Sequence, residues 1–200
     1  MAACALTAPS HDETGDATYD VVVVGDSILA VDLASYDRPG WFADLADGRQ
    51  PFYGNDGASS SWDAVDLGVA LIAPGGCLVF QDNGLPLGDD EWARLLTHIV
   101  RVLPDDRCLV FVTTYSSQTG QFTLEPFPHM IAMSHTRIMV ELIAAQPCHA
   151  LVRWDIAVVA DPLLVGPDGT HPSPAGSAWL LDGVLTALSA SASCRPATPS

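Results

Sequence analysis

Two short stretches of the sequence contain a serine, an aspartate and a histidine, the three residue types that nucleophilic catalysis by serine requires. Ser27 follows a run of four valines and a Gly-Asp pair, whereas Asp168 and His171 stand three residues apart near the C-terminus. A serine hydroxyl is a weak nucleophile at neutral pH and needs a base within hydrogen-bond reach. His171 is the natural base, and Asp168 could fix its tautomer by accepting from the other ring nitrogen. The simpler alternative is that Ser27 only caps a helix.

The stretch before Ser27 indicates how that residue is presented. The apolar run at residues 20–24 predicts a short, fully buried strand that stops at Gly25. A helix is expected from about Ile28 to Tyr36. Because ligands bind beyond the carboxyl ends of strands in open parallel sheets, a hydroxyl at this turn is well placed for chemistry.

The rest of the chain alternates between short apolar runs and segments of helical period. Each predicted strand is followed by a predicted helix, which favours an α/β fold with one five-stranded parallel sheet and helices on both faces. Another turn or two of helix is expected at 41–46. The remaining strands are expected at 50–53, 77–81, 108–114 and 150–154, and the remaining helices at 59–72, 89–103, 131–147 and 174–188.

Composition and length predict a single domain. The 200 residues, 48% of them hydrophobic, can bury one sizeable core. Residues 1–18 and 191–200 are rich in small and polar residues and are expected to be disordered tails. Residues 19–190 are expected to form the domain.

The charge balance limits the partners that this chain can bind. Its formal net charge is -16, with 24 acidic residues against eight basic ones, all arginine. Such a field repels phosphate backbones and anionic membrane surfaces, so we expect no nucleic-acid or membrane partner. The N-terminus has no basic region followed by an apolar stretch, and no run approaches a membrane span, which predicts a cytoplasmic protein. The sequence does not indicate an oligomeric state.

The cysteines and histidines do not form a metal-binding pattern. The five cysteines are widely spaced and mostly lie in apolar runs, so we interpret them as reduced, buried thiols: Cys4, Cys77, Cys108, Cys148 and Cys194. No C-x-x-C pair argues for zinc, and His129 and His135 lack H-E-x-x-H spacing. The turn after the first strand also lacks the later glycines of a dinucleotide-binding motif.

Two further groups are expected on the same rim of the sheet as Ser27. Gly54 or Gly57 would follow the second strand, and Asn83 follows the third. An unobstructed backbone N–H and a side-chain amide are suitable donors to an oxyanion. Gly54 directly ends the expected strand at 50–53, while Gly57 belongs to an Asn-x-Gly pattern, and both remain candidates.

At these residues the chain resembles the SGNH (GDSL-type) hydrolases. The matching blocks are Gly25-Asp26-Ser27, Asp82-Asn83-Gly84 and the segment 168–176, which reads DGTHPSPAG. The resemblance implies a flavodoxin-like three-layer α/β/α fold and a Ser-His-Asp triad, without a metal or cofactor. It also implies an oxyanion hole formed by the Ser27 N–H, a glycine of the second block and the Asn83 amide. One departure is Gln81, which stands where the family usually has glycine.

The resemblance implies a hydrolase that cleaves a small acyl ester, such as an O-acylated sugar or a metabolite ester, through an acyl-enzyme. An acyltransferase with an alcohol or amine acceptor, or a binding module with a disabled site, are the alternatives. Asp26, Phe122 and Phe127 are the candidate substrate contacts. The two phenylalanines belong to a long loop at 115–129 that either covers the acyl pocket or fills a small core of its own. Asp155 is an alternative acid or a structural residue.

Overall fold

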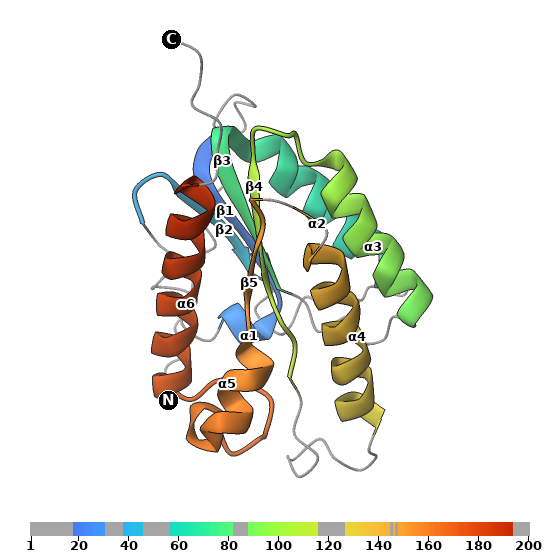
Figure 1. The fold of residues 1–200 in the computed structure, drawn as a ribbon, viewed down its shortest axis with the longest axis vertical. Helices are drawn as coiled ribbons and strands as arrows, with labels where there is room; N and C mark the ends of the chain where they lie inside the picture. Colours follow the sequence, from blue (N-terminus) through green and yellow to red (C-terminus); the bar gives the residue numbers. More distant parts are fainter. Residues whose placement is uncertain are drawn as a thin grey trace, which may run out of the picture.

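Five parallel strands form one sheet at the centre of the computed structural model (Figure 1). The structure describes residues 18–30, 38–45, 57–81, 88–115, 127–144, 146 and 148–193. The strand order is β2-β1-β3-β4-β5, which confirms the predicted parallel α/β sheet. The strands are β1 (Tyr19–Gly25), β2 (Trp41–Leu45), β3 (Ile72–Gln81), β4 (Cys108–Val112) and β5 (Ala150–Val152).

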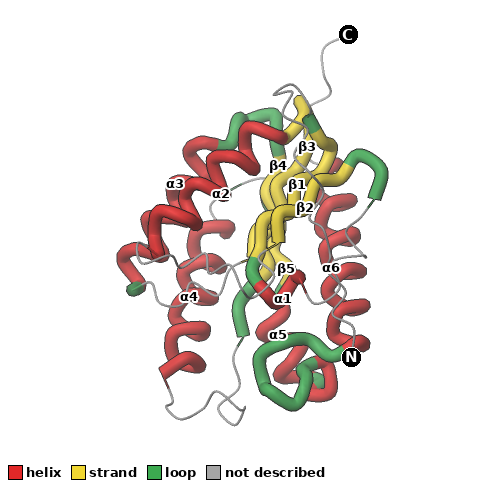
Figure 2. The backbone as a smooth tube through the Cα atoms, turned by 180° about the vertical axis from the view of Figure 1, so that it is seen from behind, coloured by secondary structure: helices red, strands yellow, loops and turns green. Residues whose placement is uncertain are grey.

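Helices cover both faces of this sheet. In Figures 1 and 2, α2 (Gly57–Leu71), α3 (Asp89–Val102) and α4 (Phe127–Ala144) lie on one side, and α6 (Pro174–Ser193) lies on the other. The two short helices α1 (Ser27–Ala30) and α5 (Trp154–Ala160) lie at the end of the sheet where the strands finish. A 3-10 turn, η2 (Pro162–Leu164), follows α5.

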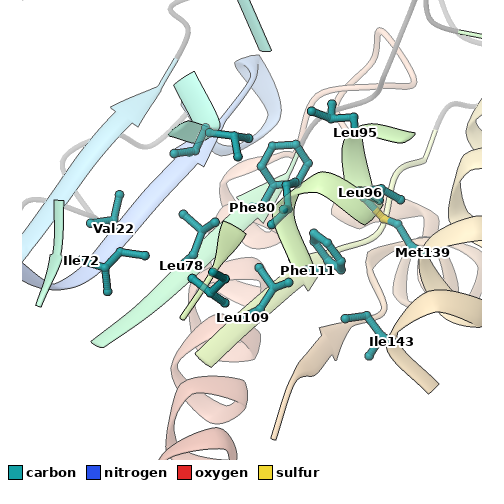
Figure 3. Close-up of a cluster of buried hydrophobic side chains, with 14 of the residues drawn as sticks. Val22, Ile72, Leu78, Phe80, Leu95, Leu96, Leu109, Phe111, Met139 and Ile143 are labelled. Carbon is teal, nitrogen blue, oxygen red and sulfur yellow. The ribbon is translucent and has the colours of Figure 1, made fainter. Parts of the chain in front are cut away.

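Burial on both faces explains why the valine run forms β1. Val22 and Val24 pack into the layer of α2, α3 and α4, whereas Val21 and Val23 pack into the layer of α1, α5 and α6. β-branched side chains suit such a strand, because their restricted rotamers pack well on a pleated surface. The larger core side chains lie in the first layer, where Figure 3 shows Phe80 and Phe111 between the strands and the helices.

The strand order reverses direction at β1, and such a reversal is where open α/β sheets have a crevice between neighbouring strands. The chain passes from β1 to β2 on one side and then returns to place β3 on the other side of β1. Ligands of open α/β sheets bind outside the carboxyl ends of the strands at such a reversal. In this sheet those ends are Gly25 and Gln81, which are partners in the register of β1 and β3.

Three sequence predictions about individual elements were wrong. β2 is formed by Trp41–Leu45, where a helical turn was expected. The parallel pairing of β2 with β1, from Val21 opposite Trp41 to Gly25 opposite Leu45, overrides the local helical preference. The strand expected at 50–53 lies outside the described residues. Residues 154–160 form α5 in place of a loop, and α4 begins at Phe127, inside the loop expected at 115–129.

The interpretation of the cysteines as reduced thiols was wrong for Cys77 and Cys108, which form a disulfide bond, and for Cys148, which is also disulfide-bonded. Cys77 and Cys108 begin the β3–β4 pairing and stand opposite each other in its register. Widely spaced cysteines in the sequence therefore meet because their strands are neighbours. Among the described residues, no helix is both long and apolar enough to span a membrane.

The disulfide should contribute measurably to stability. The two cysteines are separated by 31 residues, and closing a loop of that length in the unfolded chain is worth about 3 to 4 kcal/mol. We expect the double variant Cys77→Ala/Cys108→Ala to lose about that much free energy of unfolding in urea titrations. Alkylation of both Cys77 and Cys108 by iodoacetamide in the denatured, unreduced wild type, read by peptide mass mapping, would show instead that this bond does not form.

Candidate active site

Asp168 and His171 form a close pair at the carboxyl end of the sheet, before α6. The Nδ1 atom of His171 lies 2.6 Å from Oδ2 of Asp168. The other carboxylate oxygen, Oδ1, accepts the backbone N–H groups of Thr170 at 2.9 Å and His171 at 3.0 Å. Both side chains are partly exposed, at 25% and 31%, so the pair is accessible from solvent. The sequence prediction that these two residues act together is thus geometrically possible.

The electrostatics of this pair fix which nitrogen carries the proton. Burial acts to raise the pKa of Asp168, but the hydrogen bonds from Thr170 and from the ring and backbone of His171 outweigh it, and the pKa lies below its usual value. The carboxylate is therefore ionised at neutral pH and can only accept a hydrogen bond. Nδ1 of His171 must donate, which leaves Nε2 as the proton acceptor of the neutral ring.

The lowered pKa also links this pair to stability. Because folding lowers the pKa of Asp168, its ionised form stabilises the folded chain at neutral pH. That contribution is lost as the pH falls below about 3.9 toward the folded-state value.

The loop that carries the pair is held at both ends. Gly169 has a φ of +75°, a left-handed conformation that favours glycine. The Gly166 N–H donates to the His171 carbonyl at 2.7 Å, and Val165 and Pro172 form an isolated antiparallel bridge. Ser173 then ties the loop to η2, since its hydroxyl donates to the Leu163 carbonyl at 2.8 Å. The pair is therefore held by local backbone bonds.

Ser27 is the first residue of α1, one residue before the helix start expected from the sequence, and the structure describes its backbone alone. The turn before it is held by Asp26, whose N–H donates to the Gln81 carbonyl at 3.2 Å. The Asp26 carboxylate accepts the Ile28 N–H at 2.8 Å. Asp26 is buried and caps α1, so its contact with substrate stays a prediction.

Packing brings α1 and the His171 loop into one layer. Ile28 and Leu29 of α1 belong to the same buried cluster as Leu164 and Leu180. These two leucines stand just before and just after the segment that contains Asp168 and His171. The described residues therefore place the start of α1 and the acid-base pair at the same end and on the same face of the sheet.

The other predicted site residues are described only in part. Gly54, Asn83 and Phe122 lie outside the described residues, so their predicted roles stay predictions. Gly57 is the first residue of α2, and Phe127 is the first residue of α4. The strand that Gly54 was expected to end also lies outside the described residues, so the choice between Gly54 and Gly57 stays open.

Asp155, the alternative acid, has its own partners. Its Oδ1 accepts from the Thr113 hydroxyl at 2.6 Å and from Nε of Arg153 at 2.9 Å, and its Oδ2 accepts from Nη2 of Arg153 at 2.7 Å. Burial acts to raise the pKa of Asp155, but the hydrogen bonds from Arg153 and Thr113 outweigh burial, and the pKa lies below its usual value. The carboxylate ties β4 to the start of α5, which favours the structural interpretation.

Two features at this end of the sheet were not found from the sequence. The hydrogen bond from Thr113 to Asp155 depends on β4 and β5 being neighbours, which no local pattern shows. Gln81 was noted only as a departure from a family glycine. In the structure its side chain is buried, and neither of its polar atoms has a hydrogen-bond partner among the residues that the structure describes.

Gly176, in the first turn of α6, should be required for the placement of the loop. A Cβ atom added there would lie 2.0 Å from the Leu164 carbonyl oxygen and 2.9 Å from the Trp154 ring. We expect Gly176→Ala to cost about 1 to 3 kcal/mol of stability and to lower activity, because α6 must move away from η2.

Gly88 offers a matched control, because an added Cβ would meet nothing within 4 Å. Gly88 is the N-cap of α3, where alanine is less favourable than glycine, so Gly88→Ala should cost only about 0.5 kcal/mol, less than Gly176→Ala. Urea denaturation of both variants would test the expectation, which equal stabilities would contradict.

Comparisons with known proteins identify the fold. No protein-family model matches the chain, and no curated protein matches it in sequence. Among solved structures, the catalytic domain of peptidoglycan O-acetyltransferase A from Streptococcus pneumoniae, with a methylsulfonyl adduct, superposes with a TM-score of 0.67. The two share 18% identity, over 90% of this chain and 97% of that one.

Two lipases have similar structures. A GDSL-like lipase from Bacteroides thetaiotaomicron has a TM-score of 0.64 and 14% identity, over 84% of this chain and 87% of that one. A lipase/acylhydrolase from Enterococcus faecalis has a TM-score of 0.55 and 13% identity, over 91% and 100%. At such identities the likeness shows the fold, so the chain has the three-layer α/β/α fold of the SGNH and GDSL hydrolases and acyltransferases.

Proposed function

We propose that this protein is a serine hydrolase that cleaves a small acyl ester through a Ser27-His171-Asp168 triad and an acyl-enzyme. The observation that carries the proposal is the 2.6 Å contact between His171 Nδ1 and Asp168 Oδ2. It lies on the sheet face and at the sheet end where α1 starts with Ser27. A base whose tautomer is fixed in this way is what a serine nucleophile requires.

The proposed reaction has two half-reactions. In the first, Nε2 of His171 accepts the proton of the Ser27 hydroxyl while Ser27 Oγ attacks the ester carbonyl carbon. The protonated ring then donates to the leaving alcohol, and an acyl-Ser27 ester remains. In the second, His171 takes a proton from water, which attacks the carbonyl carbon of that ester. The ring then returns this proton to Ser27 Oγ as the acyl–oxygen bond breaks, which releases the acid and restores the free serine. Asp168, ionised throughout, stabilises the imidazolium.

The negative oxygen that forms in each half-reaction needs hydrogen-bond donors. The proposed donors are the Ser27 N–H at the start of α1, the N–H of Gly54 or Gly57, and the Asn83 amide. Losing one such donor typically costs about a hundred- to a thousandfold in kcat.

An acyltransferase is the second candidate, and an inactive binding module the third. The fold is shared with a domain named as a peptidoglycan O-acetyltransferase as well as with lipases. The same triad would serve if an alcohol or amine replaced water in the second half-reaction. Adding candidate acceptors during ester turnover distinguishes the first two, since a transferase diverts the acyl group to the acceptor and a hydrolase releases the acid.

The cytoplasmic location stays a prediction. The Cys77–Cys108 disulfide counts against it, because structural disulfides are rare in reducing compartments. Trapping free thiols in intact cells, followed by mass analysis of the protein, would establish the state of this pair where the protein resides.

Ser27 should form a covalent adduct with a fluorophosphonate. Intact mass spectrometry should show one added phosphonyl group on the wild type and none on Ser27→Ala, because only an activated serine reacts readily. Label that persists in Ser27→Ala would reject this nucleophile, and a wild type that takes no label would favour the inactive binding module.

Asp168→Asn and Asp155→Asn form a matched pair of acid variants. Asp168→Asn should lower kcat by about a thousandfold or more, because an amide can hold His171 in the wrong tautomer. Asp155→Asn should leave kcat nearly unchanged but cost about 1 to 3 kcal/mol of stability through the lost bonds to Arg153 and Thr113. If the kinetic effects were reversed, Asp155 would be the acid of the triad.

A further inference from the structure

Gln81 carries a buried carboxamide without a partner in the part of the chain that the structure describes. None of its surface is exposed (0%), and neither Oε1 nor Nε2 has a hydrogen-bond partner among those residues. Burying unpaired polar atoms costs stability, and an apolar side chain of the same length would avoid that cost. Packing alone therefore does not explain a glutamine at this position.

The position of Gln81 coincides with the crevice between β1 and β3. It is the last residue of β3 and the register partner of Gly25. Gly25 precedes Ser27 by two residues, and Gln81 precedes Asn83 by two residues. Its backbone carbonyl already accepts the Asp26 N–H at 3.2 Å. Gln81 thus stands beside the turn that presents the proposed nucleophile.

The alternation of β3 gives the direction of the side chain. Leu78 and Phe80 pack into the layer of α2, α3 and α4, whereas Val79 packs into the layer of α1 with Ile28 and Leu29. Successive side chains of a strand point to opposite faces, so the Gln81 side chain faces the α1 layer. Ser27 is the first residue of α1, so an acyl group on Ser27 Oγ would lie at the start of α1, on the face of the sheet that the Gln81 side chain faces.

We propose that Gln81 is a specificity-determining residue that binds an acyl group with a hydroxyl on the carbon next to the ester carbonyl. The hydroxyl can donate to Oε1 or accept from Nε2. Since bulk water does not reach the carboxamide, an acyl group without a hydroxyl leaves it unpaired, and such sites discriminate strongly. This inference rests on the proposed function and names its substrate class as short 2-hydroxyacyl esters.

Two esters of equal acyl size test the proposal. Ethyl glycolate has a hydroxyl where ethyl propionate has a methyl group, and release of acid from each can be followed by titration. Each kcat/KM is divided by the rate constant for hydroxide hydrolysis, which removes the difference in intrinsic reactivity. The wild type should prefer glycolate by about tenfold or more after this correction, the value of one hydrogen bond that would otherwise be unmade.

Gln81→Met keeps the length of the side chain and removes its hydrogen bonds. It should lose the glycolate preference without a lower melting temperature, and Gln81→Leu serves as the second variant. Ser191→Ala is the control, because it removes a different buried polar group, a hydroxyl near the far end of α6 that has no partner among the described residues. It should keep the wild-type ratio.

An unchanged ratio in either folded variant, or a wild type without the preference, would overturn the inference. So would a large fall in melting temperature in both variants, since it would show that the glutamine serves the fold. These outcomes are separate from failure of the proposed function, which would appear as a wild type that takes no phosphonate label at Ser27.

Discussion

The parallel pairing of β1 between β2 and β3 is the constraint on which the rest of the structure depends. β1 is covered by strands on both edges and by helices on both faces, so its four valines are almost completely removed from water. No other arrangement of this run would bury as much apolar surface without leaving its backbone unpaired. The pairing also fixes where β1 ends. Gly25 finishes level with Gln81, and the chain must turn there and present Ser27 at the rim.

The acid-base pair is built by different means. Asp168 and His171 depend on hydrogen bonds within one short loop, with the carboxylate accepting two backbone N–H groups and the imidazole. The loop is then joined to the sheet layer through Leu164 and the start of α6. Sheet pairing positions Ser27, the proposed nucleophile, and a local turn positions His171, the proposed base. The docking of α6 then brings these two residues to the same end of the sheet.

The sequence predicted the parts of the fold that have strong local signals. The valine run, the amphipathic α3 and the Ser-Pro start of α6 agree with the structure. The position of β2 was wrong because Trp41–Leu45 is a strand only through its pairing with β1. The short α5 was missed because seven residues give too little periodicity to recognise.

For the candidate site, the spacing of Asp168 and His171 was enough to predict their contact, because a three-residue separation within a turn allows few geometries. The contacts of Asp155, the Cys77–Cys108 bond and the unpaired state of Gln81 could not be predicted in this way. Each depends on the register of strands whose residues are distant in the chain. Such properties arise only when the sheet order is known.

The in-register pairing of Gly25 with Gln81 also has a consequence for the order of folding. These residues are 56 positions apart (81 − 25), so the turn that presents Ser27 is completed only after a long loop closes, a slow step in chains rich in non-local contacts. The turn around Asp168 and His171 needs only neighbouring residues and can form much sooner. A partly folded chain would therefore form the Asp168–His171 contact before the turn at Ser27 is in place, so the proposed triad would be complete only in the fully folded chain.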